Sequence, residues 1–169
     1  MTIRDAVSAD LPAIVRIYNA AVPGRMATAD TEPVTVESRR AWFAEHAAGT
    51  RPLWVAVAEG PIVGWLSFQS FYGRPAYRTT AEVSVYVAPG NRRAGIGREL
   101  LSRAITAGPG MGLRTLLGFV FSHNAASLAL FESLGFGRWG VLPAVAELDG
   151  VERDLVIVGR RLAGATSHA

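Results

Sequence analysis

Residues 82–97 read E-V-S-V-Y-V-A-P-G-N-R-R-A-G-I-G, and this stretch decides the fold. Valine at every second position up to Val87 has the two-residue period of a strand. Pro89-Gly90-Asn91 ends that strand. The turn that follows opens a helix predicted from about Gly95 to Ala107. Because another apolar strand, Arg114–Phe121, comes next, the segment predicts one central β-α-β crossover.

The remaining elements lie on both sides of this crossover. Before it, a strand is predicted at residues 2–5, helices at about 10–21 and 35–49, and strands at 53–58, 62–71 and 79–88. After it, a helix is predicted at 124–134 and strands at 136–145 and 151–161, with Asp149-Gly150 between them as a hairpin signal. We expect Asp10 and Thr35 to cap the first two helices. The order β-α-α-β-β-β-α-β-α-β-β predicts an α+β domain with a mixed central sheet of about seven strands and about four helices.

Composition limits the class of protein. The chain has 169 residues, 50% of them hydrophobic, which predicts a single domain over 1–169 with a core at about 2–162 and a short C-terminal tail. No run approaches the roughly 20 apolar residues that cross a bilayer, and no signal peptide is expected. The absence of cysteine excludes disulfides, thiolate zinc sites and a cysteine nucleophile. The three histidines show no metal-ligand spacing, so we expect a cytoplasmic enzyme or binding domain without a metal.

The charge pattern favours a small anionic ligand over nucleic acid. The sequence pI is about 9.9 and the formal net charge is +3, but the arginines are scattered, whereas nucleic-acid binding gathers charge on one face. Only Arg92-Arg93 lies beside a glycine-rich turn. Backbone N–H groups at a helix N-terminus can cradle an anion. Gly95 and Gly97 would permit close backbone approach, and the arginines would add charged hydrogen bonds.

From these residues alone, the loop has two interpretations of similar weight. It is either a phosphate cradle or a glycine-containing turn with solvated arginines. A P-loop is excluded because no Gly-Lys-Ser/Thr follows, and a dinucleotide fingerprint is excluded because the third glycine is absent.

Arg92–Gly97, R-R-A-G-I-G, matches the [Q/R]-x-x-G-x-[G/A] signature of the GNAT acetyltransferase superfamily, and the chain resembles that family over residues 2–162. The run Asn124–Phe136, N-A-A-S-L-A-L-F-E-S-L-G-F, is similar to the family's second conserved block. Arg74–Tyr77, Ala81–Val87 and Ala125–Phe136 most resemble the phosphinothricin and methionine sulfoximine N-acetyltransferases. The resemblance implies a GNAT fold with a sheet splayed in the middle, acetyl-CoA as cosubstrate, a small-molecule amine acceptor and a homodimer.

The resemblance also implies how acetyl-CoA is held. The pantetheine arm enters the splay and pairs with the backbone of Val85 and Val87. The pyrophosphate lies on the loop that consists of Arg92, Arg93, Ala94, Gly95, Ile96, Gly97 and Arg98. Asn124 bonds the end of the pantetheine, and Ser127 lies near the sulfur. Independently of the family, Asn124 is also a candidate N-cap of the following helix, and the two roles are compatible.

Glu82 is the candidate catalytic base. It stands between Ala81 and Val83 in a strand otherwise poor in charge. An amine nucleophile must lose a proton, and a positioned carboxylate can accept it directly or through water. Partial burial would raise the pKa of the carboxyl toward the working pH. The alternatives are a solvated strand glutamate or an ion pair with Arg74 or Arg78.

The loop before this strand holds candidate acceptor-binding residues. A guanidinium can grip a carboxylate with two parallel hydrogen bonds, and the subgroup resemblance implies substrate binding at Arg74 and Tyr77. Arg78 has no counterpart in that pattern and is interpreted as solvated. His123 precedes a predicted helix and could line the site, although a histidine in a loop is more often incidental.

Three regions depart from the family's pattern. Phe131 stands where many GNAT enzymes place a tyrosine that protonates the departing thiolate, so water or the Ser127 hydroxyl would have to serve. The hairpin Glu147–Asp154 and the loop Met26–Pro33 are also poorly matched. Both help to wall the acceptor site, which leaves the acceptor open.

The function expected from the sequence is direct acetyl transfer in a ternary complex. The acceptor would be the α-amine of a small amino acid or analogue, such as methionine sulfoximine, methionine sulfone or phosphinothricin, with a backbone N–H near Val87 polarising the thioester carbonyl. Acetylation of an aminoglycoside, polyamine or protein N-terminus is one alternative. A non-catalytic acyl-CoA-binding or sensor domain is another, and the presence of Glu82 favours an enzyme over it.

Overall fold

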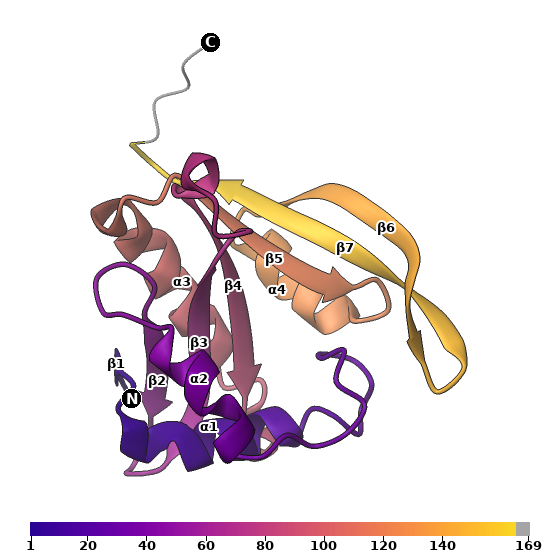
Figure 1. Ribbon diagram of the computed structural model, residues 1–169, viewed down its shortest axis with the longest axis horizontal. Helices are drawn as coiled ribbons and strands as arrows, with labels where there is room; N and C mark the ends of the chain where they lie inside the picture. The colour runs from indigo at the N-terminus through magenta and orange to yellow at the C-terminus, as the bar shows by residue number, and fades with distance from the viewer. Residues whose placement is uncertain (165–169) are drawn as a thin grey trace.

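The computed structural model describes residues 1–164, which form one open sheet with helices on both faces (Figure 1). The strands are β1 (Thr2–Asp5), β2 (Leu53–Val57), β3 (Ile62–Ser70), β4 (Thr80–Val87), β5 (Thr115–Phe121), β6 (Gly137–Leu148) and β7 (Val151–Arg161). The helices are α1 (Leu11–Asn19), α2 (Arg40–Ala44), α3 (Ile96–Ala107) and α4 (Ala125–Ser133). The strand order is β1-β2-β3-β4-β5-β7-β6, and each neighbouring pair is antiparallel except β4–β5. The predicted α+β class, with a mixed seven-stranded sheet and four helices, is confirmed.

Each face of the sheet has its own hydrophobic cluster. On one face, Val83 of β4 belongs to a cluster with Leu100 of α3 and Leu128 of α4. On the other face, Trp65 of β3 packs with Ile14 of α1. Burial of a large apolar side chain contributes about 1.5–3 kcal/mol, so both helix layers are held firmly against the strands that carry the site.

α1 begins directly after Asp10, as predicted, but the Asp10 side chain does not cap it. The carboxylate instead accepts hydrogen bonds from the Val7 N–H at 2.8 Å and from the Arg4 guanidinium at 2.6 Å. The hydrogen bond with Arg4 holds the pKa of the Asp10 carboxyl below its usual value. The prediction of a side-chain cap was therefore wrong, because this carboxylate closes the turn that precedes the helix.

The second helix is much shorter than the predicted span 35–49. A 3₁₀ turn at Glu37–Arg39 leads into α2, which ends at Ala44. Thr35 does act as a cap, since its Oγ1 accepts a hydrogen bond from the Ser38 N–H at 3.1 Å. The chain then turns back through Gly49, whose φ is 85°. This left-handed turn, which glycine permits at little cost, replaces the last part of the predicted helix.

The sheet opens between β4 and β5 (Figure 1). These parallel strands pair only over Thr80–Glu82, opposite Thr115–Leu117. Beyond that point β4 stays paired with β3, and β5 stays paired with β7. The expected splay is therefore present, and the edge of β4 beyond Glu82 is open to a ligand or another chain.

β6 and β7 form the predicted hairpin, which projects beyond the rest of the molecule (Figure 1). Asp149 and Gly150 have φ values of 52° and 77°, as a two-residue type I′ turn requires. β6 continues to Leu148, beyond its predicted end at residue 145. The tip also contacts the loop between α1 and α2, because Arg25 Nε lies 2.8 Å from the Asp149 carboxylate.

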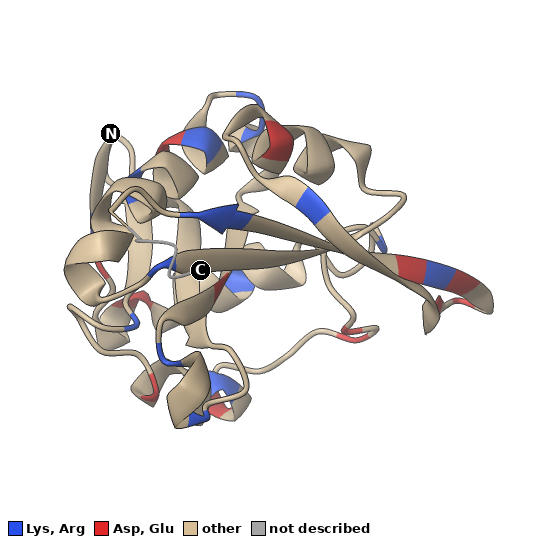
Figure 2. Cartoon of the chain, turned by 90° about the horizontal axis from the view of Figure 1, so that it is seen from above, with Lys and Arg blue, Asp and Glu red and all other residues tan. Residues whose placement is uncertain are grey.

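Charged residues of both signs are distributed over helices, strands and loops (Figure 2). Within residues 1–164, no helix has the length and apolar character needed to cross a membrane. The same residues contain no group of three or more side chains arranged to hold a metal ion.

Candidate active site

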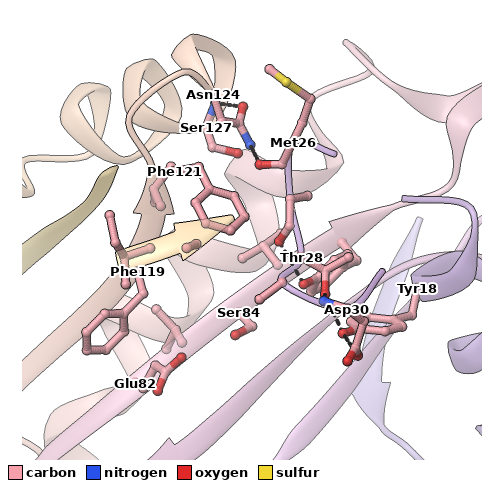
Figure 3. Close-up of a pocket in the computed structure, with 18 of the residues that line it drawn as sticks. Tyr18, Met26, Thr28, Asp30, Glu82, Ser84, Phe119, Phe121, Asn124 and Ser127 are labelled. Atoms are coloured by element: carbon pink, nitrogen blue, oxygen red, sulfur yellow. Dashed lines mark hydrogen bonds between the residues drawn. The ribbon is translucent and has the colours of Figure 1, made fainter. Parts of the chain in front are cut away.

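A cavity of about 550 Å³ lies where β4 and β5 diverge. We call it the splay cavity. Its walls come from both strands, from α4, from the loop between α1 and α2, and from the β6–β7 hairpin (Figure 3). Five residues singled out in the sequence line it: Glu82, Val85, Asn124, Ser127 and Phe131.

The backbone of β4 beyond Glu82 directs hydrogen-bonding groups into this gap. The Ala88 N–H donates to the Val63 carbonyl of β3 at 2.8 Å, whereas the Thr79 carbonyl accepts from β5. Successive residues of a strand direct their backbone groups to opposite sides, so the odd-numbered residues of β4 face β5. Val85 and Val87 therefore direct their N–H and C=O groups toward the gap, where no strand of residues 1–164 pairs with them.

The Glu82 carboxylate lies at the point of divergence (Figure 3). Glu82 is the last residue of β4 that pairs with β5, opposite Leu117, and it is half-buried. Burial raises the pKa of its carboxyl above the usual value, because removal from water disfavours the ionised form. Neither Arg74 nor Arg78 forms an ion pair with it among the described residues.

The loop that precedes α3 contains two left-handed residues. Arg93 has a φ of 64° and Gly95 a φ of 78°, and the segment Arg92–Gly95 is exposed throughout. The first N–H groups of a helix have no partner within the helix. Beside two exposed arginines, they provide the geometry that an anion-binding helix N-terminus needs.

Two further residues of the predicted phosphate loop make structural contacts. A Cβ on Gly97 would lie 3.3 Å from the Leu130 side chain of α4 and 3.6 Å from that of Val85. Glycine at this position therefore allows α3 to pack closely against α4 and β4. This packing requirement is separate from the close approach of a diphosphate that was predicted from the sequence. Arg98 Nη1 donates to Ser133 Oγ at 2.9 Å and joins α3 to the end of α4.

Asn124 caps α4, as predicted from the sequence. Its Oδ1 accepts a hydrogen bond from the Ser127 N–H at 3.1 Å, and its Nδ2 donates to the Met26 carbonyl at 3.0 Å. Asn124 is buried, and both it and Ser127 line the cavity. The amide is thus fixed in orientation, and one of its N–H groups is left for a ligand.

The loop between α1 and α2 crosses the splay cavity, and we call its residues 25–30 the strap. The carbonyl groups of residues 25–27 each accept one hydrogen bond, from His123 Nε2 at 2.8 Å, the Asn124 amide at 3.0 Å and the Tyr86 hydroxyl at 3.0 Å respectively. His123 is not among the cavity-lining residues. Its contact with the strap gives it a structural role.

The strap also forms a polar cluster that the sequence analysis did not identify. The Tyr18 hydroxyl bonds Thr28 Oγ1 at 2.5 Å and the Asp30 carboxylate, which pairs with Arg39 at 2.9 Å. Burial, together with the hydrogen bond to Asp30, raises the pKa of Tyr18. All four residues line the splay cavity, and Figure 3 shows Tyr18, Thr28 and Asp30 close together. The poor family match of residues 26–33 marked only Thr28 and Asp30 in the sequence, and nothing there linked them with Tyr18 and Arg39.

Phe131 is buried and lines the same cavity. Its ring lies over Gly118 of β5, where an added Cβ would come within 2.9 Å of it, and packs edge-on against Phe136 at 5.0 Å. A phenyl ring carries no exchangeable proton. Protonation of a leaving group by a tyrosine at this position is therefore excluded.

Arg74 and Tyr77 lie outside the splay cavity. Both are exposed in the loop between β3 and β4, where Arg74 precedes a 3₁₀ turn. The Tyr77 ring packs against Phe71 at 5.3 Å and Tyr72 at 6.0 Å. The structure thus places both residues just before β4 in the chain, but not in the wall that contains Glu82.

The motif, the splayed sheet and the cavity agree with a comparison against known families. The model of the "Acetyltransferase (GNAT) family" matches residues 12–136. The chain belongs to the GNAT acetyltransferase family. This GNAT protein is therefore an acetyltransferase, and acetyl-CoA is the donor that its family uses.

The similarity to individual relatives extends over nearly the whole chain. The protein is 51% identical over 163 residues to "Putative phosphinothricin acetyltransferase YwnH" of Bacillus subtilis (strain 168), which covers 96% of this chain and 99% of that protein. It is 37% identical over 158 residues to the "L-methionine sulfoximine/L-methionine sulfone acetyltransferase" of Pseudomonas paraeruginosa, with 93% and 92% covered. The crystal structure of a GNAT superfamily phosphinothricin acetyltransferase from Sinorhizobium meliloti in complex with acetyl-CoA has a TM-score of 0.91 and 32% identity, covering 99% of this chain and 92% of that one.

Proposed function

We propose that this GNAT enzyme transfers the acetyl group of acetyl-CoA directly to the α-amine of a small amino acid or analogue, such as methionine sulfoximine, methionine sulfone or phosphinothricin. The observation that carries the proposal is the half-buried Glu82 carboxylate at the point where β4 and β5 part. The activities named for two relatives support an acceptor that resembles an amino acid.

Two features of the chain fit acetyl-CoA. The free backbone groups of Val85 and Val87 suit the amide groups of a pantetheine arm, which can pair with a strand edge as a peptide does. The N-terminus of α3, with Arg92 and Arg93 exposed beside it, suits a diphosphate. Ser127, in the cavity wall, would lie near the thioester end of the arm.

Glu82 would act as the general base. Burial raises the pKa of the Glu82 carboxyl toward neutral pH, and a general base is most effective when its pKa is near the working pH. As the amine nitrogen bonds to the acetyl carbon, its proton passes to Glu82, and a backbone N–H near Val87 stabilises charge on the carbonyl oxygen. The carbon–sulfur bond then breaks. The thiolate takes a proton from water or from the Ser127 hydroxyl, because Phe131 has none to give.

Arg74 and Tyr77 belong to this proposal as the binding residues for the acceptor's α-carboxylate. The Arg74 guanidinium is exposed and forms no ion pair within residues 1–164. It is therefore available for a bidentate contact with a carboxylate. An acceptor held there, just before the start of β4, would present its amine toward Glu82.

We also propose that the enzyme acts in the cytoplasm as a homodimer. Apolar side chains that are 40–55% exposed gather on the β6–β7 hairpin, namely Trp139, Val141, Leu142, Val145 and Val151. A concentration of exposed apolar side chains often marks a protein–protein contact. A monomer in sedimentation equilibrium at micromolar concentration would refute the dimer.

The test of the acceptor is a screen of acetyl-CoA-dependent thiol release across amino acids, their sulfoximine, sulfone and phosphinate analogues, polyamines and aminoglycosides. We expect the highest kcat/KM for a member of the amino-acid group. A preference for polyamines or aminoglycosides would overturn the acceptor and leave the acetyltransferase activity in place. Binding of acetyl-CoA without transfer to any amine would instead indicate a sensor.

A further inference from the structure

A second cavity of about 160 Å³ lies beside the splay cavity, between the sheet and helices α1 and α2. We call it the side pocket. Four residues line both cavities, which are therefore adjacent: Tyr18, Arg39, Ser84 and Tyr86.

Paired residues of β3 and β4 line a continuous path from Glu82, the proposed base, to the side pocket. Three directly opposed pairs follow one another along the strands: Gln69 with Glu82, Ser67 with Ser84, and Trp65 with Tyr86. Opposed residues of an antiparallel pair project from the same face, and the stacked rings of the third pair lie 4.6 Å apart. At about 3.3 Å per residue, the serine pair lies about 7 Å along the strand from Glu82.

Aromatic rings form the walls of the side pocket. Trp42 of α2 packs edge-on against Trp65 at 5.7 Å, and the Tyr18 ring lies 5.1 Å from that of Tyr86. The indole N–H of Trp65 donates to the Ile14 carbonyl at 3.1 Å. Because an indole has only this one donor, Trp65 offers a ligand an apolar surface.

Polar side chains form the floor of the side pocket, because Ser67, Gln69 and Ser84 all line it. Ser67 is 1% exposed, and Gln69 and Ser84 are half-buried. Their hydroxyl and amide groups can donate hydrogen bonds, and a polar group held away from bulk water is best satisfied by such a bond. A ligand with a hydrogen-bond acceptor at its tip therefore suits this floor. The volume corresponds to about five water molecules.

The side pocket is poorly suited to a charged group. Arg39, at its border with the splay cavity, is its one ionisable side chain that carries a full charge among the described lining residues. That charge is already paired with Asp30 at 2.9 Å and lies 4.9 Å from the centre of the Tyr18 ring. A charged tip deeper in the pocket would be desolvated without a partner.

We propose that the side pocket binds the side chain of the acceptor amino acid, and that Ser67, Gln69 and Ser84 recognise a hydrogen-bond acceptor at its tip. This inference rests on the proposed amino-acid acceptor and specifies its class. With the amine at Glu82, a short side chain extends past Ser84 between the aromatic walls. The preferred acceptors have an apolar stem and an uncharged polar end, such as a sulfone, sulfoximine or carboxamide, so among the acceptors named above the charged phosphinate of phosphinothricin is disfavoured.

The experiment compares methionine sulfone with methionine as acceptors, using thiol release to measure kcat/KM. Ser67→Ala should lower kcat/KM for the sulfone about three- to tenfold, the effect of one neutral hydrogen bond. It should change kcat/KM for methionine less than about twofold, because a thioether is a weak acceptor. Ser70→Ala is the matched control, since Ser70 lies on the same strand opposite Ala81 and therefore on the other face; it should alter neither value.

The outcomes distinguish a failure of the side-pocket assignment from a failure of the proposed function. Equal losses for the two acceptors, or no loss for the sulfone, would overturn the side-pocket assignment while amino-acid acetylation stands. A wild-type enzyme that acetylates no amino acid would overturn both. Thermal unfolding shows whether Ser67→Ala is folded. If it is not, the same comparison is made with Ser84→Ala, whose position is half-buried. This variant should also lower kcat/KM for methionine sulfone more than for methionine.

Discussion

Replacing Glu82 with glutamine keeps the size of the side chain and its ability to hydrogen bond, but removes the proton acceptor at the divergence of β4 and β5. General-base catalysis contributes about 10²–10⁴-fold, so Glu82→Gln should lower kcat by that factor. In free energy, this is about 3–5.5 kcal/mol of activation barrier. The affinity for acetyl-CoA should stay nearly unchanged, because the free backbone groups of Val85 and Val87 and the N-terminus of α3 are left intact.

The pH profile gives a second readout of the same change. The carboxyl accepts a proton only when it is ionised, so wild-type kcat/KM should rise with pH through the pKa of Glu82. Because burial raises that pKa, this rise should lie at higher pH than for an ordinary glutamate. In Glu82→Gln the acidic limb should disappear and the profile should be flat over the same interval.

Stability should change in the opposite direction to activity. Below the unfolded-state pKa of Glu82, the carboxyl is protonated in both states and contributes nothing to the pH dependence. Above its raised folded-state pKa, it is ionised in both states, and burial of the charge destabilises the folded protein in full. Glu82→Gln should therefore be more stable than wild type at about pH 8, and the gain should shrink as the pH falls toward 4.

The assays are steady-state thiol release, calorimetric titration with acetyl-CoA and urea unfolding at two pH values. Glu59→Gln is the matched control, because Glu59 is exposed in the turn between β2 and β3. It should leave kcat, the pH profile and the unfolding free energy unchanged. Wild-type turnover with an unaltered acidic limb in Glu82→Gln would falsify the assignment of Glu82 as the base.

Three further predictions concern the donor site, the acceptor and the fold. Wild type should bind acetyl-CoA with a micromolar Kd, about −8 kcal/mol, and Gly95→Asp and Arg93→Glu should each weaken binding at least about tenfold; unchanged affinity of both variants in calorimetry would remove the pyrophosphate from this loop. Arg74→Ala and amidation of the acceptor's carboxylate should each lower kcat/KM by about 10–150-fold but should not add; additive losses would show that Arg74 does not hold the carboxylate. Asn124→Ala removes the cap of α4, so urea unfolding should show a loss of about 0.5–2 kcal/mol, and equal stability would mean that the cap contributes nothing.

The sequence predicted those parts of the fold whose signals are local. The alternating valines of β4, the turn after it and the start of α3 lie within residues 82–97, and their order indicated the crossover. The cap at Asn124 and the turn at Asp149-Gly150 are equally short patterns. The position of Glu82 in the splay came from the family resemblance, because the divergence of two strands has no local signature.

The errors arose where distant contacts determine the local structure. The predicted helix over 35–49 failed because the chain reverses at Gly49 to bring Arg51 back toward Ala47. Gly97 was predicted to make room for a ligand, and the sequence did not show that it also makes room for Leu130, which is remote in the sequence. A glycine at the start of a helix does not indicate whether a ligand or a neighbouring side chain occupies the space beside it.

The polar cluster of the strap could not have been found by spacing. Tyr18 has the spacing of a core residue on α1, and its side chain does contact the aromatic face of the sheet. Its hydroxyl reaches Thr28 and Asp30 only because the strap folds back over the cavity. Arg39 joins them from the turn before α2. No short pattern unites residues from three separate segments.

The strap is tied down through its main chain, and this determines what evolution can vary in the enzyme. His123, Asn124 and Tyr86 hold the carbonyl oxygens of residues 25–27, and a carbonyl oxygen is the same whichever amino acid carries it. The identities at positions 26 and 27, which line the splay cavity, can therefore be exchanged while the path of the chain over the cavity is retained. Selection for a new amine can alter the cavity wall at these positions without disturbing the cap of α4 or the open edge of β4.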